Sequence, residues 1–276
     1  MSKNFQGPEL LRQNVGHVTS GVGGCFLGSH VMFRGKDLHA EFAQARWMDL
    51  YLFGITGRRF SEAQLRLLEA IWTYTSYPDA RIWNNRVAAL AGSTRSSGNL
   101  GVSAALAVSE AAIYGRGIDI RASDLLIRAR AHVAAGGELG PWVRAELAER
   151  RSLAGYGRPL SSRRDERLDP ILALARSLGQ ADGPHLQLAL EIERFLVDSR
   201  LRMTANYGAM AAALTADMGL SPREHYLYVH GAFLAGMLPC YIDAEARPAG
   251  TFLPLPCEAV AYHGAPKRTW LHGTGR

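Results

Sequence analysis

Apolar positions recur at helical spacing through most of the chain after residue 41. The clearest helix begins at Ser61, which has the spacing of a capping box with Gln64, and its apolar residues share one face until Pro78 ends the pattern. The same periodicity predicts further helices over residues 84–90, 99–113, 122–135 and 141–153. Segment 17–38 is rich in glycine and predicts turns with a short hairpin. We therefore predict an all-α fold with almost no strand.

A loop rich in Gly, Ser and Arg covers residues 155–169 and interrupts the helical pattern. Helices are predicted after it over 170–178, 185–198 and 204–218. Ser221 and Pro222 then begin a helix over 221–238, with a capping residue followed by proline. Taking the loop as a domain boundary, we predict the first part of a large helical domain in 1–154, a smaller helical domain in 155–235, and a return to the large domain with a tail in 236–276.

Composition narrows the classes of partner. The chain has 276 residues, 47% of them hydrophobic and 20% charged, as in ordinary globular proteins. Its net charge of +6 favours anionic partners. The basic residues are scattered, apart from segment 158–167, and no aromatic residues are interleaved with them, so we predict no nucleic-acid partner.

The three cysteines, Cys25, Cys240 and Cys257, form no CxxC pair and no cluster with zinc spacing. We therefore predict no metal site and a reducing compartment, the cytoplasm. The polar N-terminal segment and the lack of a long apolar run predict neither a signal peptide nor a membrane span. Gly21, Gly23 and Gly24 faintly match a phosphate-binding loop, but Phe26 occupies the next glycine position of the dinucleotide motif.

Three stretches occur in the order found in the citrate synthase and citryl-CoA lyase superfamily, and resemble its motifs. They are 32–38 (MFRGKDL) with 47–54 (WMDLYLFG), 153–160 (LAGYGRPL) with Asp165-Glu166-Arg167, and 203–220, which ends in ADMGL. Arg247-Pro248 and Tyr262-His263-Gly264 are a weaker fourth match. The resemblance implies a large and a smaller helical domain with a cleft between them, a homodimer, and C–C bond formation or cleavage on a coenzyme A (CoA) thioester without a metal.

The resemblance also assigns catalytic positions, but with altered residues. Tyr114 stands where the family has the histidine that polarises the thioester carbonyl. Arg158 replaces the histidine of the Gly-Tyr-Gly-His loop, and Asn206 falls near the catalytic aspartate. We predict that these three residues line the site.

Other positions carry over as binding residues. Thr75 aligns with the histidine that holds the oxo-acid, Arg167 retains the arginine of the family's Asp-Pro-Arg motif, and Tyr207 lies beside Asn206. These three residues are predicted to bind substrate. The predicted CoA-binding residues are in the flexible basic loop, where arginine forks suit phosphates and stack on adenine: Gly155, Tyr156, Gly157, Arg163 and Arg164.

The altered positions leave the proton-abstracting group unassigned. Asparagine cannot take a proton at neutral pH, and arginine stays protonated. Three hypotheses stay open: an enzyme with a different base, a catalytically silent CoA- or polycarboxylate-binding or regulatory relative, and an unrelated all-α protein. Candidates for a different base are His225, His230, His263 and Asp217. Asp217 lies near a helix end and has capping as its alternative role.

Overall fold

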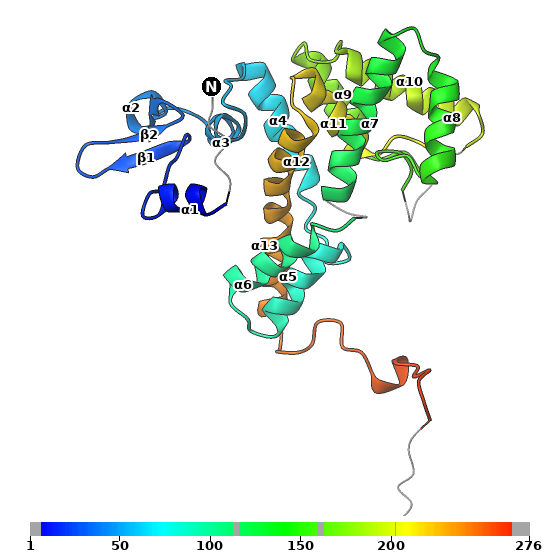
Figure 1. Ribbon diagram of the computed structural model, residues 1–276. Helices are drawn as coiled ribbons and strands as arrows, with labels where there is room; N and C mark the ends of the chain where they lie inside the picture. The colour runs from blue at the N-terminus through cyan, green and yellow to red at the C-terminus, as the bar shows by residue number, and fades with distance from the viewer. Residues whose placement is uncertain (1–6, 113–115, 159–162, 202, 267–276) are drawn as a thin grey trace, which may run out of the picture.

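The computed structural model describes residues 7–112, 116–158, 163–201 and 203–266. Helix makes up 60% of them, which confirms the all-α prediction. Figure 1 shows four regions: small N-terminal elements on one side, a bundle of α7 to α11 on the other, α4 and α12 between them, and α5, α6 and α13 below. A tail follows α13 away from the body.

The N-terminal region contains the sheet. Its elements are α1 (Pro8–Asn14), β1 (Gly23–Phe26), β2 (His30–Phe33), β3 (Lys36–Asp37), α2 (Leu38–Glu41) and α3 (Trp47–Thr56). The strands pair antiparallel in the order β1-β2-β3, so the predicted hairpin gains a third strand. Arg34 connects the sheet to α3, because its Nε and Nη2 donate to the Gly54 carbonyl at 3.0 and 2.8 Å.

Helix α4 (Glu62–Thr75) begins with the predicted capping box between Ser61 and Gln64. Its buried face consists of Leu65, Leu67, Leu68 and Ile71. Helix α12 (Pro222–His230) lies beside it and is attached by polar groups as well, since the Tyr228 hydroxyl donates to the Leu68 carbonyl at 2.6 Å.

Three helices form the lower region: α5 (Trp83–Ser93), α6 (Gly98–Val108) and α13 (Leu234–Glu245). A Cβ at Gly92 would lie 2.2 Å from the Tyr241 carbonyl oxygen, so glycine is needed for α5 to approach α13. The single helix predicted over 221–238 is wrong. A 3-10 turn, η1 (Gly231–Phe233), divides it into α12 and α13. Gly231 lies where a Cβ would be 2.6 Å from the Trp72 ring.

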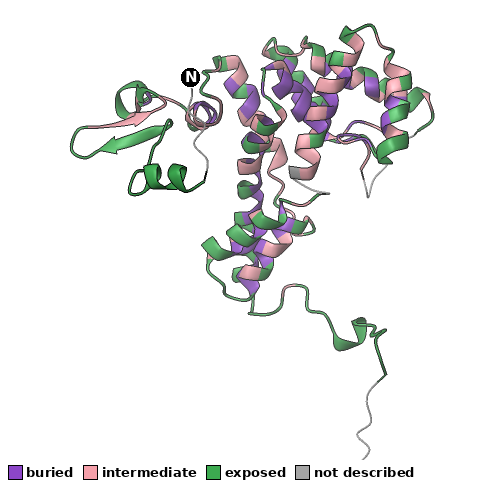
Figure 2. Ribbon diagram, viewed as in Figure 1, coloured by how far each residue is buried: buried purple, intermediate pink, exposed green. Residues whose placement is uncertain are grey.

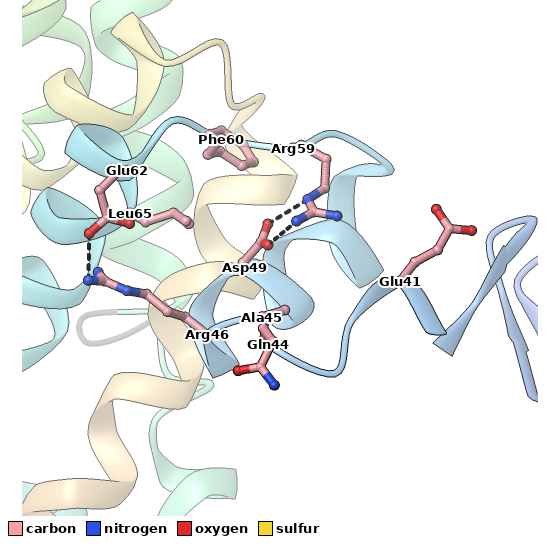
Figure 3. A pocket seen from close by; sticks show the side chains of 9 residues that line it. All are labelled: Glu41, Gln44, Ala45, Arg46, Asp49, Arg59, Phe60, Glu62 and Leu65. Carbon is pink, nitrogen blue, oxygen red and sulfur yellow. Dashed lines mark hydrogen bonds and ion pairs between the residues drawn. The ribbon is translucent and has the colours of Figure 1, made fainter. Parts of the chain in front are cut away.

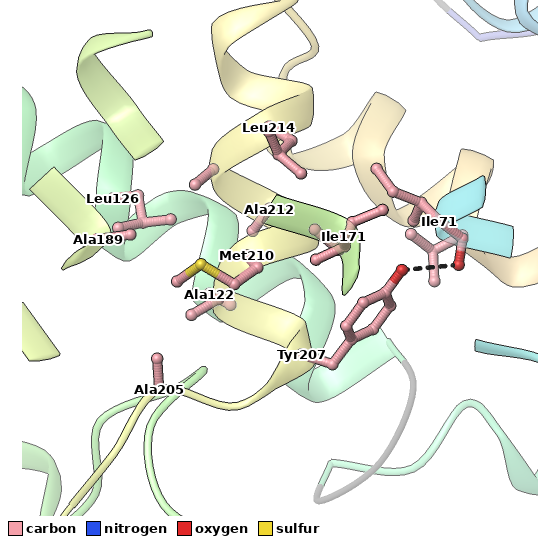
Figure 4. Close-up of a cluster of buried hydrophobic side chains, with 14 of the residues drawn as sticks. Ile71, Ala122, Leu126, Ile171, Ala189, Ala205, Tyr207, Met210, Ala212 and Leu214 are labelled. Carbon is pink, nitrogen blue, oxygen red and sulfur yellow. Dashed lines mark hydrogen bonds between the residues drawn. The ribbon is translucent and has the colours of Figure 1, made fainter. Parts of the chain in front are cut away.

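The bundle contains α7 (Arg116–Ala134), α8 (Leu139–Arg150), α9 (Leu168–Ser177), α10 (Pro184–Asp198) and α11 (Tyr207–Asp217). Helix α11 is its centre, with every residue from Ala209 to Ala216 buried (Figures 2 and 4). Helix α7 packs against both α10 and α11. These contacts cross residue 154, the predicted end of the first segment, so the two-domain division stays a prediction.

Exposure differs sharply along the chain. The bundle and α4 enclose one buried apolar cluster, whereas the tail from Arg247 to Pro266, including η2 (Cys257–Ala259), is almost wholly exposed (Figure 2). Within the described ranges, no helix has the length and apolar content that a bilayer crossing requires.

Candidate functional site

The Gly155 loop and the segment before α11 are held together as a short antiparallel pair. The Gly157 amide donates to the Thr204 carbonyl at 2.7 Å, and the Asn206 amide donates to the Gly155 carbonyl at 2.8 Å. Gly155 has φ 88°, and a Cβ there would lie 2.8 Å from Ala209 Cβ. Glycine at this position therefore allows the loop to contact the first turn of α11.

Asn206 is the N-cap of α11. Its Oδ1 accepts from the Gly208 amide at 2.9 Å, and its Nδ2 donates to the Gly157 carbonyl at 2.9 Å. Its side chain is half-buried. The residue predicted to be catalytic thus has a clear structural function, and it orients the loop that carries Arg158.

Arg158 forms one of two arginine–carboxylate pairs at the site. Its Nη1 lies 2.7 Å from Glu166 Oε2, and the Tyr77 hydroxyl donates to Glu166 Oε1 at 2.9 Å. These bonds, with that of Arg158 foremost, lower the pKa of Glu166 to about 2. Glu166 is therefore ionised at neutral pH and is a poor proton acceptor.

Arg167 forms the second pair, with the buried carboxylate of Asp165. Its Nε and Nη2 donate to Asp165 Oδ1 and Oδ2 at 2.8 and 2.7 Å. The Tyr207 amide donates to Asp165 Oδ2 at 2.9 Å. The guanidinium lies 4.6 Å from the ring centre of Tyr207 and 4.9 Å from that of Tyr77. Two tyrosines therefore enclose the charged group.

The C-terminal end of α4 also contacts these residues. Both the Tyr207 hydroxyl and Thr75 Oγ1 donate to the Ile71 carbonyl, at 3.1 and 2.8 Å (Figure 4 shows the first of these bonds). Burial raises the pKa of Tyr207, so its hydroxyl stays protonated. The structure thus brings Thr75, Arg167, Tyr207 and Asn206 close together, and Arg158 joins them through Glu166 and Tyr77.

Sequence reasoning missed the residues that connect these groups. Tyr77 carries the bridging hydroxyl, and its loop is held by the buried Asn85, whose Nδ2 donates to the carbonyls of Tyr77 and Asp79 at 2.6 and 3.1 Å. Asp165 and Glu166 adjoin Arg167, and that acidic pair in a basic loop was an available signal. No local pattern indicated Tyr77 or Asn85.

The predicted CoA-binding residues have different environments. The ring of Tyr156 is buried, and its hydroxyl donates to the Ala189 carbonyl at 3.0 Å. Arg164 pairs with Asp169 and lies 3.6 Å from Glu193. Arg163 is exposed. Tyr114 lies outside the described residues. The solvent-accessible part of the predicted CoA surface is therefore basic side chains rather than the Tyr156 ring.

The proposed substitute bases are placed away from these pairs. His225 is fully buried, its Nδ1 lies 2.8 Å from Thr215 Oγ1, and burial lowers its pKa to about 4. Asp217 caps α10, with its carboxylate accepting from the amides of His185 and Leu186 at 2.8 and 2.9 Å. Asp217 therefore has the helix-capping role that was the alternative to its being a base. His263 is exposed in the tail, and His230 Nδ1 lies 3.8 Å from Glu110.

A separate hollow of about 380 Å³ lies between α3 and α4 (Figure 3). Its charged side chains already satisfy each other: Arg59 donates to both oxygens of Asp49 at 3.0 and 2.6 Å, and Arg46 lies 2.5 Å from Glu62. None of the predicted site residues lines it. We therefore place the candidate site at the arginine pairs and not at this hollow.

The arrangement favours binding of anions. Arg158 and Arg167, with hydroxyl groups around them, can hold carboxylates or a developing oxyanion. Within the described ranges, His, Cys, Asp and Glu side chains form no group suited to a metal ion.

Comparison with solved structures gives the fold. A citryl-CoA lyase from Hydrogenobacter thermophilus superposes with a TM-score of 0.79 at 19% identity, covering 92% of this chain and 97% of that one. This chain has the citrate synthase fold. The match confirms the predicted fold class, and at this identity it extends to the fold alone.

Two larger proteins match in part. An ATP citrate lyase from Methanosaeta concilii in complex with (3S)-citryl-CoA gives a TM-score of 0.70 at 16% identity, over 96% of this chain and 47% of that one. A citrate synthase from Thermotoga maritima gives 0.64 at 16%, over 81% and 59%. This chain thus spans about half the length of these two proteins. No protein-family model and no curated protein sequence matches it.

Proposed function

We propose that this protein binds a CoA thioester and makes or breaks a C–C bond next to the thioester carbonyl. The observation that carries the proposal is the pair of guanidinium groups, Arg158 and Arg167, gathered with Tyr77, Tyr207 and Asn206 where the Gly155 loop meets α11. The fold shared with a citryl-CoA lyase over nearly its whole length supports the same reading.

Each residue has a role in this proposal. Arg167, aligned by Asp165 and the two tyrosines, holds a substrate carboxylate. Arg158 exchanges Glu166 for a second carboxylate or for the developing oxyanion. Thr75 and Asn206 orient the substrate. Tyr114, in its predicted place, donates to the thioester oxygen. Arg163 and Arg164 attract the CoA phosphates.

The decisive experiment measures binding and turnover separately. Calorimetry with acetyl-CoA and with citryl-CoA tests binding, and release of acetyl-CoA from citryl-CoA tests chemistry. Saturable binding with cleavage that falls in Arg167→Ala supports the proposal. Arg81→Ala is the control, because Arg81 has the same fork to an aspartate but lies exposed in another loop. If the protein binds neither acetyl-CoA nor citryl-CoA, the proposal is rejected.

A second function, a catalytically silent CoA- or polycarboxylate-binding protein, is favoured by one observation. Each site arginine is already neutralised by a carboxylate of its own chain, Glu166 or Asp165. A ligand must compete with these pairs, as in a binding site that stays closed until occupied. Tight binding of citryl-CoA without cleavage would select this function.

We further propose a cytoplasmic homodimer. Helix α6 supports it, since Leu100 is 70% exposed there and only Gly101 and Ala105 of the helix are buried. Helix α11, by contrast, is buried in the bundle and contributes no such surface. The described cysteines are all unpaired, which suits a reducing compartment.

A further inference from the structure

Asp119 has a buried carboxylate oxygen without a partner. It lies in the first turn of α7. Its Oδ2 is the one buried carboxylate oxygen among the described residues that accepts no hydrogen bond. Burial raises its pKa to about 7. The Asp119 residue is partly exposed, but its Oδ2 atom is buried.

Buried and half-buried aspartates with structural roles have hydrogen-bond partners in this protein. Asp49 is held by Arg59, Asp165 by Arg167 and the Tyr207 amide, and Asp217 by two amides of α10. An unpaired buried carboxyl group lowers the stability of the folded protein. We therefore expect such a residue to persist only where it has a function.

The first turn of α7 lies against the candidate site. A Cβ on Gly208 would be 3.8 Å from Ile118 Cγ2, and the Gly208 amide is the one that Asn206 caps. Figure 4 shows the start of α7 beside the turn of α11 that carries Tyr207. Asp119 follows Ile118 directly. Two helix N-termini therefore meet here, with a carboxyl group in one of them.

The other carboxylates of the site are unsuited to proton transfer. Glu166 is bound by Arg158 and Tyr77, and its pKa is lowered to about 2. Burial alone would raise the pKa of Asp165, but the bonds and charge of Arg167 lower it below the ordinary value. A base works best when its pKa lies near the working pH, and Asp119 meets that condition.

We propose that Asp119 is the carboxyl that exchanges a proton with the α-carbon of the bound acyl group. In the cleavage direction, the substrate hydroxyl gives its proton to water and its carbon becomes the ketone, the electrons of the breaking C–C bond pass into the thioester as an enolate, and protonated Asp119 gives its proton to the enolate carbon. In the condensing direction, the Asp119 carboxylate takes that proton, the enolate carbon attacks the ketone, and the alkoxide that forms takes a proton from water. This inference rests on the proposed function, because it requires a CoA thioester at the site.

The test uses exchange of the α-protons of acetyl-CoA in D₂O, followed by NMR, together with citryl-CoA cleavage and calorimetric binding of acetyl-CoA. In Asp119→Asn, exchange and cleavage should fall by about 10²–10⁴-fold. Acetyl-CoA affinity should stay within about threefold, about 0.7 kcal/mol. The melting temperature at pH 8 should be unchanged or higher, because an unpaired buried charge is removed. Asp124→Asn is the control, since Asp124 lies on the same helix with its side chain 47% exposed.

Three outcomes would overturn the inference. Exchange at the wild-type rate in Asp119→Asn and Asp119→Ala would show that another group moves the proton. A lower melting temperature together with loss of acetyl-CoA binding in both variants would show a structural role. Wild-type protein that binds acetyl-CoA but exchanges no α-protons would reject Asp119 while leaving CoA binding intact. Wild-type protein that binds no thioester fails at the earlier step, so failure of the proposed function is recognisable.

Discussion

Asn206 and Gly157, 49 residues apart, are joined by a 2.9 Å hydrogen bond from the asparagine Nδ2 to the glycine carbonyl. The bond fixes the loop that presents Arg158 against the N-terminus of α11. Only an amide can both cap the helix through its oxygen and donate to the loop through its nitrogen.

Replacing Asn206 with aspartate should keep the cap and lose the donor. The Gly157 carbonyl would then face a carboxylate, and we expect the free energy of unfolding to fall by about 1–3 kcal/mol. Urea denaturation measures the change. Asn14→Asp is the control, because the Asn14 side chain makes its bond to Leu10 in solvent and should change stability by less than about 0.5 kcal/mol. Equal effects of the two substitutions would contradict the structural role.

Removing Arg167 should leave Asp165 buried without a counter-charge. We expect Arg167→Ala to lower the free energy of unfolding by about 3–5 kcal/mol. Arg81→Ala removes a comparable fork in which the arginine side chain is 89% exposed, and it should change stability by less than about 1 kcal/mol. Chemical denaturation of the two variants side by side separates a buried pair from an exposed one.

The same pair should give the protein a defined acid sensitivity. The folded-state pKa of Asp165 is lowered, so its stabilising contribution is present above the ordinary value near 3.8 and is lost as pH falls through the lower folded value. Melting temperatures between pH 2 and pH 6 should show this loss in the wild type and less of it in Arg167→Ala. Identical pH profiles would mean that other carboxylates control acid unfolding.

Arg163 and Arg164 should contribute to CoA affinity by charge. Replacing both with alanine is expected to raise the dissociation constant for acetyl-CoA about tenfold at low salt, about 1.4 kcal/mol. The difference should shrink above about 0.15 M salt, because exposed charges are screened. Arg12→Ala with Arg194→Ala is the matched control, since both side chains are exposed on other helices. Calorimetric affinities equal to the wild type would exclude this loop as the CoA site.

Citrate synthase activity with acetyl-CoA and oxaloacetate should be very low. CoA release also requires a group that activates water to hydrolyse the citryl thioester, and neither the amide at position 206 nor the guanidinium at position 158 can act as that base. CoA release measures the rate in the wild type and in the double variant Arg158→His with Asn206→Asp. Gain of turnover in the double variant would support a preserved site with altered chemistry. Robust wild-type turnover would show that these positions are assigned incorrectly.

Light scattering at micromolar concentration should give the mass of a dimer. Leu100→Asp places a charge on the exposed face of α6. It should yield monomers with little change in the free energy of unfolding, because Leu100 is 70% exposed in the monomer. Leu11→Asp, at an equally exposed leucine of α1, should leave the dimer intact. A monomeric wild type would reject the dimer.

Helix positions were predictable where the determinants are local. The capping boxes of Ser61 with Gln64 and Ser221 with Glu224 place both partners within one turn, so the sequence alone locates the start of α4 and α12. The end of α12 was not predictable in this way. Its change to a 3-10 turn at Gly231 accompanies close packing against Trp72, which is distant in sequence.

The sequence by itself determined the helical fold class, the helix starts and the basic loop with Arg158 and Arg167, because periodicity and capping act over a few residues. Tertiary structure alone decided how these arginines are used. Glu166 meets Tyr77 across 89 residues, Asp165 meets Tyr207 across 42, and packing of α7 in the bundle buries the oxygen of Asp119. A carboxylate's charge and pKa depend on the groups that surround it, and those come from segments that no local pattern connects.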